Sequence, residues 1–143
     1  MTTEKRIDYH IEFFSQWHCG SGLSAGADID LLVIKDKEGM PFIPGKTLKG
    51  LIREAVENLV LYKGQTKGSV EQVFGKEGEV SGCAHFSNAQ LDDSEYKAIV
   101  ANKAQHFLYQ KVTTTSISDN DGIAEDHSLR SLEVVVPCTL HAH

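Results

Sequence analysis

The chain has 143 residues, of which 41% are hydrophobic and 24% are charged, so it can bury a core and wholesale disorder is not expected. Its formal net charge of −6 argues against non-specific nucleic-acid binding by overall charge, but a local basic groove stays compatible with it. This length suits one domain. No apolar run reaches the ~20 residues of a membrane span, and the charged N-terminus does not resemble a signal peptide. We therefore expect a cytoplasmic protein.

The first predicted element is a half-buried strand over residues 6–14, where apolar and polar side chains alternate. Residues 17–27 are rich in Gly and Ser and predict a flexible connection whose backbone amides could hold a phosphate. This connection lacks the spacing and the Lys-Ser/Thr ending of a P-loop, which excludes that nucleotide site. His18 within it is a candidate general base, because imidazole titrates near neutral pH.

Two acidic residues, Asp28 and Asp30, precede an apolar run at residues 31–34 that we expect to be a strand. A polar turn follows at residues 35–39. Carboxylates at this position could bind a divalent cation such as Mg²⁺. The alternative is that Asp30 simply faces solvent at the end of a strand.

A helix is predicted from Thr47 to about Tyr62, because apolar side chains recur at helical spacing. Thr47 is the expected N-cap, since its hydroxyl can accept a hydrogen bond from a free first-turn amide. Gly64 suits the C-terminal cap. The apolar positions are Leu48, Leu51, Ile52, Ala55 and Leu59.

Lys46, Lys49 and Arg53 follow one another at three and four residues and should lie along one face of this helix. The start of the helix adds free backbone N–H groups and the positive end of the helix dipole. A phosphate backbone would suit that face. A solvated basic stripe on an ordinary amphipathic helix is the open alternative.

The second half of the chain predicts shorter elements. We expect a short helix near residues 70–74, a strand at 84–91, a short helix at 92–102, β-prone residues at 113–118 and further strands at 134–136 and 139–143. Three pairs of nearby residues have the chemistry of metal ligands: His18–Cys19, Cys83–His85 and His141–His143. None has the spacing of a known zinc module. The default interpretation is therefore that the thiols are buried and the imidazoles lie on the surface.

The segment from Pro41 to Arg53, P-F-I-P-G-K-T-L-K-G-L-I-R, resembles the signature of the RAMP superfamily, the repeat-associated proteins of CRISPR systems. Members typically show I-P-G-[ST]-[ST]-L-K-G followed by Arg, and Lys46 stands where Ser or Thr is more common. Residues 21–26 are similar to the family's Gly-rich loop. Residues 82–89 and 117–133 fit two further family patterns, the second one loosely.

The resemblance implies an α+β, ferredoxin-like (RRM-like) RAMP fold with insertions, over residues 1–143 as a single domain. Residues 105–130 would be a thumb-like insertion that enters a guide–target duplex. Because no second crossing helix or last strand can be assigned, we expect a fold that is incomplete at the C-terminus, as in a split half or a truncated member.

The resemblance also implies a function. The chain is similar to the backbone subunit of type III CRISPR effector complexes, which act in antiviral defence with CRISPR RNA, target RNA and other effector subunits as partners and no membrane. The residues expected to contact CRISPR RNA are Gly22, Gly26, Lys46, Thr47, Lys49 and Arg53.

For cleavage of target RNA, the resemblance points to Asp30 as a metal-binding catalytic residue, assisted by Asp28, with Mg²⁺ or another divalent cation. Two alternatives stay open. One is a metal-independent endoribonuclease that processes CRISPR RNA with His18. The other is a scaffold subunit without catalytic activity.

Overall fold

The computed structural model describes residues 3–25, 29, 31–64, 68–76, 78–115 and 129–143. The chain divides into two compact units, which we describe separately: residues 1–10, 43–89 and 141–143 form the first, and residues 11–42 and 90–140 form the second. The expectation of a single domain stays a prediction. No described helix is both long and apolar enough to cross a membrane.

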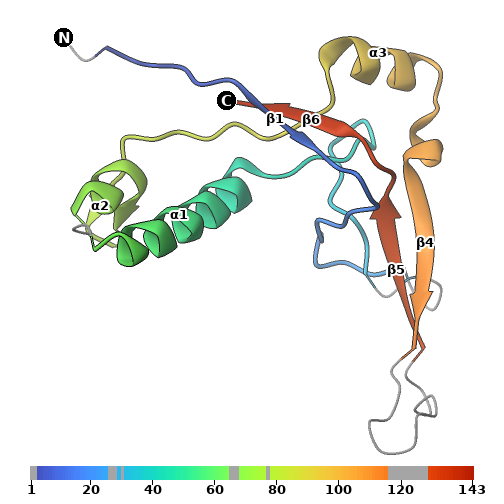
Figure 1. The fold of residues 1–143 in the computed structure, drawn as a ribbon. Helices are drawn as coiled ribbons and strands as arrows, with labels where there is room; N and C mark the ends of the chain where they lie inside the picture. Colours follow the sequence, from blue (N-terminus) through green and yellow to red (C-terminus); the bar gives the residue numbers. More distant parts are fainter. Residues whose placement is uncertain (1–2, 26–28, 30, 65–67, 77, 116–128) are drawn as a thin grey trace, which may run out of the picture. The chain divides into compact units, whose positions relative to one another are not determined.

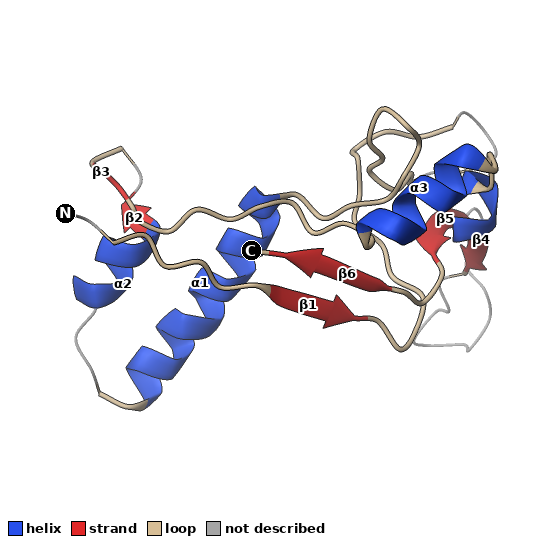
Figure 2. Cartoon of the chain, turned by 90° about the horizontal axis from the view of Figure 1, so that it is seen from above, coloured by secondary structure: helices blue, strands red, loops and turns tan. Residues whose placement is uncertain are grey.

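The first unit holds two helices and a short hairpin, namely α1 (Gly45–Tyr62), α2 (Gly68–Phe74), β2 (Gly75–Lys76) and β3 (Val80–Ser81). The second holds α3 (Asp93–Ala101), the 3-10 helix η1 (Gln105–Leu108), β4 (Tyr109–Thr114) and β5 (Arg130–Val135). Two further strands contain residues of both units: β1 (Tyr9–Glu12) and β6 (Thr139–Ala142). Figure 1 labels the three α-helices and the strands β1, β4, β5 and β6, and Figure 2 also labels β2 and β3.

The described strands pair two by two, β1 with β6, β2 with β3 and β4 with β5. The longest ladder is antiparallel and runs from Tyr109 opposite Val135 to Thr114 opposite Arg130. The mixed helix and strand content confirms the predicted α+β class. The ferredoxin-like strand order stays a prediction.

The core of the first unit lies between α1 and α2, which run side by side (Figure 1). Val60 of α1 packs with Val70 and Phe74 of α2, and all three are at least nine-tenths buried. Ile52, Val56 and Phe86 pack around this cluster. The helical period is confirmed, and burial of apolar area on the covered face stabilises the unit. The predicted apolar face is wrong in part, because Leu51, Ala55 and Leu59 are exposed, whereas the covered side chains recur every four residues: Leu48, Ile52, Val56 and Val60.

The start of α1 differs from the prediction. The helix begins at Gly45, two residues before Thr47, and Pro44 precedes it with no side-chain cap. The amide N of Gly45 instead donates to Oδ1 of Asn88, at 2.9 Å, so a residue from a distant segment satisfies a free first-turn amide. Thr47 is therefore not the N-cap.

Gly45 is required by the close approach of another segment to the helix start. A Cβ atom at this position would lie 2.1 Å from the carbonyl oxygen of Phe86, a distance no side chain can adopt. The segment that contains Phe86 is held beside the start of α1 by two backbone hydrogen bonds between Ile43 and Ala89, at 3.0 and 2.9 Å. The P-G step of the signature therefore lets a second chain segment pass over the beginning of α1.

Two segments that the sequence predicts to be strands do not form regular strands in the structure. Residues 84–91 are extended but contribute only isolated bridging residues, such as Ala89 opposite Ile43, because no strand of the described residues continues alongside them. Residues 31–34 likewise form single bridges: Leu31 pairs with Leu132, and Val33 pairs with Gly20.

Residues 113–114 of the predicted β-prone segment lie in β4, and residues 116–118 lie outside the described residues. Of the predicted strand 134–136, residues 134–135 lie in β5. Four further predicted elements are confirmed with changed bounds. The first strand shortens to β1, the helix near residues 70–74 is α2, that near 92–102 is α3, and the last alternating segment is β6. Asp92 caps α3 by accepting a hydrogen bond from the backbone N of Ser94. Residues 116–128 of the expected thumb lie outside the described residues, whereas its flanks lie in η1, β4 and the start of β5.

Candidate nucleic-acid interface

The basic face of α1 borders an open hollow of about 670 Å³ within the first unit. Its walls come from α1 on one side and from the segment through β2 and β3 on the other. The lining residues are Lys46, Lys49, Gly50, Arg53, Phe74, Gly75, Lys76, Val80, Ser81, Gly82, Ala84 and His85. The three basic residues predicted from the helical spacing are thus brought together in one site.

The hollow is positively charged although the whole chain is negative. Four of its lining residues are Lys or Arg, and none of the described lining residues is Asp or Glu. One of the four, Lys76, is ion-paired with Glu79 at 2.8 Å, so the lysines of α1 supply most of the unpaired charge. Lys46 is exposed, and among the described residues neither Lys46 nor Lys49 takes part in an ion pair. The ammonium of Lys49 is 3.5 Å from the carbonyl oxygen of Ala84, a long contact that an anion could replace. The site therefore offers two lysines to an anionic ligand.

Arg53 has a different position from the two lysines, because its guanidinium group is already bonded. Nε donates to Oε1 of Glu57 at 2.8 Å, and one terminal nitrogen donates to the carbonyl oxygen of Gly75 at 3.0 Å. These contacts connect α1 with the opposite wall of the hollow. Arg53 thus shapes the site, and part of its donor capacity stays available for a ligand.

The opposite wall depends on two glycines whose backbones are in close contact. Gly75 has φ of +86°, and a Cβ there would lie 2.6 Å from the backbone N of Gly82. A Cβ on Gly82 would lie 2.4 Å from the backbone N of Gly75. Larger residues at either position would therefore push β2 and β3 apart and change the wall.

The loop that carries the predicted catalytic carboxylates is only partly described. Backbone hydrogen bonds join Ser21 N to Leu32 O and Ala25 N to Ile29 O, both at 2.9 Å, so the segment doubles back on itself. Gly22 lies in this loop with φ of +76°. Three predicted site residues, Gly26, Asp28 and Asp30, lie outside the described residues.

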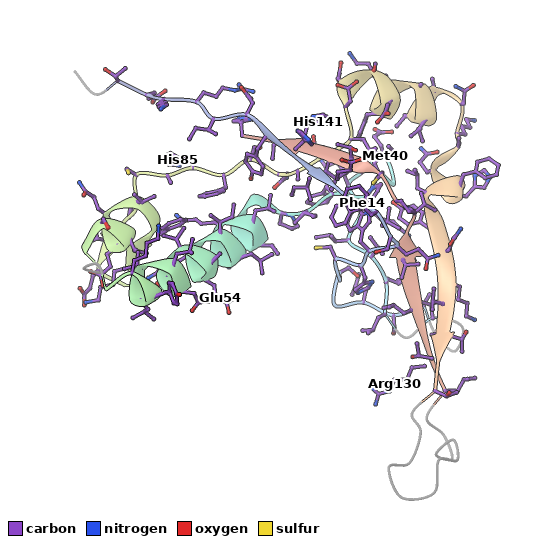
Figure 3. All side chains as sticks on the ribbon, in the orientation of Figure 1. Phe14, Met40, Glu54, His85, Arg130 and His141 are labelled. Carbon is purple, nitrogen blue, oxygen red and sulfur yellow. The ribbon has the colours of Figure 1, made fainter. Side chains whose placement is uncertain are left out.

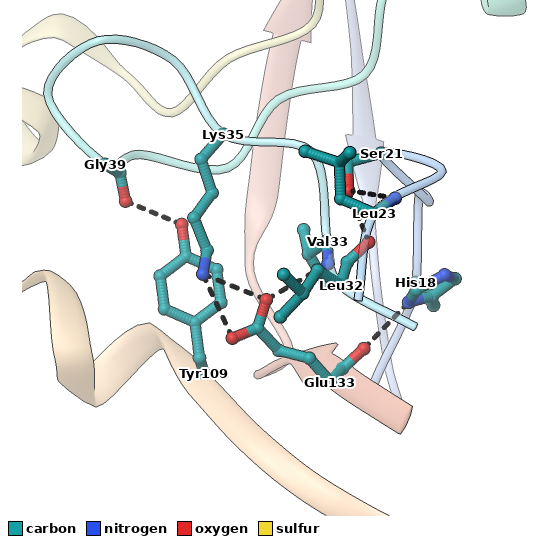
Figure 4. A network of polar contacts seen from close by, with 9 residues as sticks. All are labelled: His18, Ser21, Leu23, Leu32, Val33, Lys35, Gly39, Tyr109 and Glu133. Atoms are coloured by element: carbon teal, nitrogen blue, oxygen red, sulfur yellow. Dashed lines mark hydrogen bonds and ion pairs between the residues drawn. The ribbon is translucent and has the colours of Figure 1, made fainter. Parts of the chain in front are cut away.

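The base of this loop is attached to β5 through Glu133, which is only 8% exposed (Figure 4). The Glu133 carboxylate accepts hydrogen bonds from the backbone N of Val33 and from Nζ of Lys35, each at 3.0 Å. The Lys35 ammonium also lies 4.1 Å from the ring centroid of Tyr109 on β4. Burial and the nearby carboxylates raise the pKa of Tyr109, whose hydroxyl donates to the Gly39 carbonyl at 2.7 Å.

His18 is held by the same strand. Its Nδ1 lies 2.7 Å from the carbonyl oxygen of Glu133, so Nδ1 carries the proton and Nε2 has a free lone pair in the neutral ring. The neighbouring Cys19 thiol is partly buried, and burial raises its pKa, which disfavours the thiolate that a metal would need. No group of three or more His, Cys, Asp or Glu side chains among the described residues is placed to hold a metal ion.

Asp36 is a third acidic residue near this loop, and it is structural. Its Oδ1 accepts from the backbone N of Glu38 at 2.9 Å and of Met40 at 3.0 Å, which closes the turn before Pro41. Its Oδ2 accepts from the hydroxyl of Tyr96 at 2.6 Å. Both oxygens are thus in use within the second unit.

The sequence did not single out the far wall of the hollow. Lys76 is not among the predicted site residues, and His85 appears in the sequence analysis only as a possible metal ligand with Cys83. Glu133 appears there only within the loosely fitting family pattern of residues 117–133. The pair Phe74-Gly75 and the Gly82 motif were the available signals, because glycines at fixed places indicate close backbone approach. Which residues face Lys49 across the hollow follows only from the fold.

Comparison with known proteins supports the predicted resemblance. The family model of the RAMP superfamily matches residues 10–138. No curated protein matches the chain. Among solved structures, a chain of the type III-B Cmr-beta complex bound to cognate target RNA aligns with a TM-score of 0.67 and 14% identity, covering 94% of this chain and 81% of its own length. A chain of the apo type III-B Cmr-beta complex aligns with a TM-score of 0.70, the same identity and the same coverage.

Proposed function

Because the chain belongs to the RAMP superfamily, we propose that it is a subunit of a type III CRISPR RNA-guided effector complex that binds the phosphate backbone of CRISPR RNA. The observation that carries the proposal is the hollow beside α1, where the basic residues of the family signature face a second wall of the same unit. The likeness of fold to chains of Cmr-beta complexes supports the class of assembly.

Lys46 and Lys49 are the expected phosphate contacts, with the side chain of Thr47 beside them. The backbone amides of Gly45 and Thr47 already donate to Asn88 and to Pro44, so they do not serve as phosphate donors. Such contacts position RNA without reading its sequence, which suits a subunit that must accept any guide. Because the net charge is −6, we expect partner proteins to share in binding a long polyanion. We therefore expect a cytoplasmic assembly in which each subunit contacts a short stretch of RNA and the guide pairs with target RNA.

Cleavage of target RNA by Asp30, assisted by Asp28, is the second part of the proposal. Carboxylate oxygens are the ligands that Mg²⁺ prefers, so the donor set fits a hard divalent cation, which would polarise the scissile phosphate. Glu133 would act indirectly, since its bonds to Val33 and Lys35 fix the segment that follows Asp30.

A second candidate activity, metal-independent processing of RNA, rests on His18. The contact of its Nδ1 with Glu133 O fixes the tautomer in which Nε2 can accept a proton. In such a step Nε2 would take the proton of a ribose 2′-hydroxyl, which attacks the adjacent phosphorus and displaces the 5′-oxygen. A scaffold role without cleavage is the remaining alternative.

The first test is native mass spectrometry of the protein co-expressed with its genomic neighbours, followed by extraction and sequencing of bound RNA. A multi-subunit particle with one short RNA of uniform 5′ end is the expected result. A lone monomer or homodimer without RNA would overturn the proposal.

The particle then allows the cleavage candidates to be separated. Loss of target cleavage in Asp30→Asn and on addition of a chelator, with activity retained in the surface control Asp93→Asn, supports the metal-dependent reading. Cleavage that survives chelation and is lost in His18→Ala supports the alternative. RNA binding with no cleavage in any buffer leaves the scaffold role.

A further inference from the structure

We infer that His10 on β1 and His141 on β6 form a binding site for a transition-metal ion of the Zn²⁺, Ni²⁺ or Cu²⁺ class. This site is separate from the proposed carboxylate site and does not depend on the proposed function. The observation that carries it is the distance between the two imidazole rings, whose centroids are 6.2 Å apart with a tilt of 41°.

The two histidines are brought together by the pairing of β1 with β6, segments far apart in the sequence (Figure 2). Both side chains are exposed, whereas Leu140 and Ala142 on either side of His141 are buried. The strand alternation therefore fixes the backbone beneath His141 and directs its ring away from the core. Figure 3 shows His141 on β6.

The geometry suits one ion held between the rings. Imidazole nitrogens bind Zn²⁺ at ~2.0–2.1 Å. The centroids of two imidazole rings that bind the same ion are therefore about as far apart as the centroids of His10 and His141. Both rings are exposed and free to make the small rotations that aim a nitrogen at the ion. Imidazole is a suitable ligand for Zn²⁺, Cu²⁺ and Ni²⁺, whereas Mg²⁺ and Ca²⁺ prefer oxygen, so the site selects a different class of metal from Asp30.

The electrostatic surroundings of the pair favour a cation. Asp8 and Glu12 lie two residues on either side of His10, and both are exposed, as His10 is. The nearby Arg6 has its charge balanced by Asp8, with Nε 2.8 Å from Oδ1. Another nitrogen of Arg6 lies 3.4 Å from Nδ1 of His143, so the ring of His143 contacts Arg6. His141 is the histidine whose ring lies beside that of His10.

With two protein ligands, the ion would keep open coordination positions filled by water or by a group of another molecule. It would also join β1 to β6 and stabilise their pairing, because the ligands are held at this spacing only in the folded chain.

The test uses the full chain without an affinity tag and measures the melting temperature in increasing ZnCl₂, with isothermal titration for stoichiometry. We expect one Zn²⁺ per chain and a rise of roughly 5 °C at a hundredfold excess over Kd. The rise should be absent in His10→Ala and in His141→Ala, and present in the control His106→Ala, which removes an exposed histidine of η1. MgCl₂ should not substitute.

An unchanged rise in either single variant would overturn the inference, as would a stoichiometry of zero in the wild-type chain. His10→Gln and His141→Gln repeat the test with a polar side chain, and circular dichroism in the absence of metal verifies that each variant is folded. A rise lost only in His18→Ala or His85→Ala would likewise overturn it and place the metal elsewhere.

Discussion

Glu133 on β5 binds Lys35 through both of its carboxylate oxygens, with Nζ–O distances of 2.9 and 3.0 Å. The carboxylate is largely buried and the ammonium is partly covered, so water cannot fully replace either partner. One of these oxygens also receives the backbone N–H of Val33. A single side chain therefore fixes the return segment of the loop that carries the predicted catalytic carboxylates.

Replacement of Glu133 by Ala should lower the free energy of unfolding by about 3 kcal/mol, because it leaves Lys35 and the Val33 amide without their partner. Urea denaturation of the isolated chain measures the change, and Glu54→Ala, on the exposed side of α1 (Figure 3), is the matched control. The double variant with Lys35→Met should lose less than the sum of the single losses. Strict additivity would show that the pair does not interact.

Two glycines of α1 should respond in opposite directions to substitution by alanine. Gly45→Ala should destabilise the fold by ~1–3 kcal/mol or more, because the new Cβ would collide with the Phe86 carbonyl. Gly50→Ala, where a Cβ meets nothing within 4 Å, should stabilise the helix by up to ~1 kcal/mol. Thermal melts of the two variants measure this contrast. Equal effects would mean that residues 86–87 do not pass over the helix start.

RNA binding should weaken when the lysines of the hollow are removed. In Lys46→Ala or Lys49→Ala, each lost phosphate contact should reduce the slope of log K against log salt by about 0.7 for a single strand. Fluorescence anisotropy with labelled single-stranded RNA at several salt concentrations measures the slope. Lys63→Ala, at the other end of α1, is the control and should leave the slope unchanged. If all three variants share the wild-type slope, RNA does not bind in the hollow.

Tyr96 should make folding stability depend on pH in the alkaline range. The hydrogen bond to Asp36, together with burial and the nearby carboxylates, raises the pKa of Tyr96 to about 12 from its ordinary value of 10.0. Because the folded-state pKa is the higher one, this stabilisation is complete below pH ~10 and is lost as the pH rises towards 12.

The Tyr96 dependence can be isolated by comparing wild type with Tyr96→Phe in urea between pH 9 and 12. The stability difference between the two proteins should shrink over this range. A constant difference would show that the Tyr96–Asp36 contact does not control the ionisation of the phenol.

The sequence predicts those features that depend on local spacing. Lys46, Lys49 and Arg53 lie along one face because a helix places residues three and four apart together, and no tertiary information is needed for that. The cap of the same helix was wrong, because Asn88 reaches Gly45 from 43 residues away. A local hydroxyl at Thr47 cannot compete once the distant amide side chain is in place.

The far wall of the hollow could not be predicted for a related reason. Gly75 and Gly82 meet only after the chain has turned through β2 and β3, and that contact decides that Lys76 and His85 face α1. The segment 84–91 was predicted as a strand from its alternation, but strand formation needs a neighbour along its whole length. Within this segment only Ala89 and Gln90 are bridge residues, with Ala89 opposite Ile43, and residues 84–88 form no ladder.

Arg53 gives the hollow a property that its lysines do not have. Its planar guanidinium group bonds Glu57 on its own helix and the Gly75 carbonyl on the opposite wall, so it connects the two walls of the hollow. A lysine here would keep the charge but could not hold both acceptors in the same fixed geometry. An exchange of Arg53 for Lys keeps the charge and looks conservative. It would nevertheless weaken the connection between α1 and the opposite wall, while the electrostatic potential of the hollow would stay almost the same. At this one position the geometry of the hollow can therefore change while its charge stays the same.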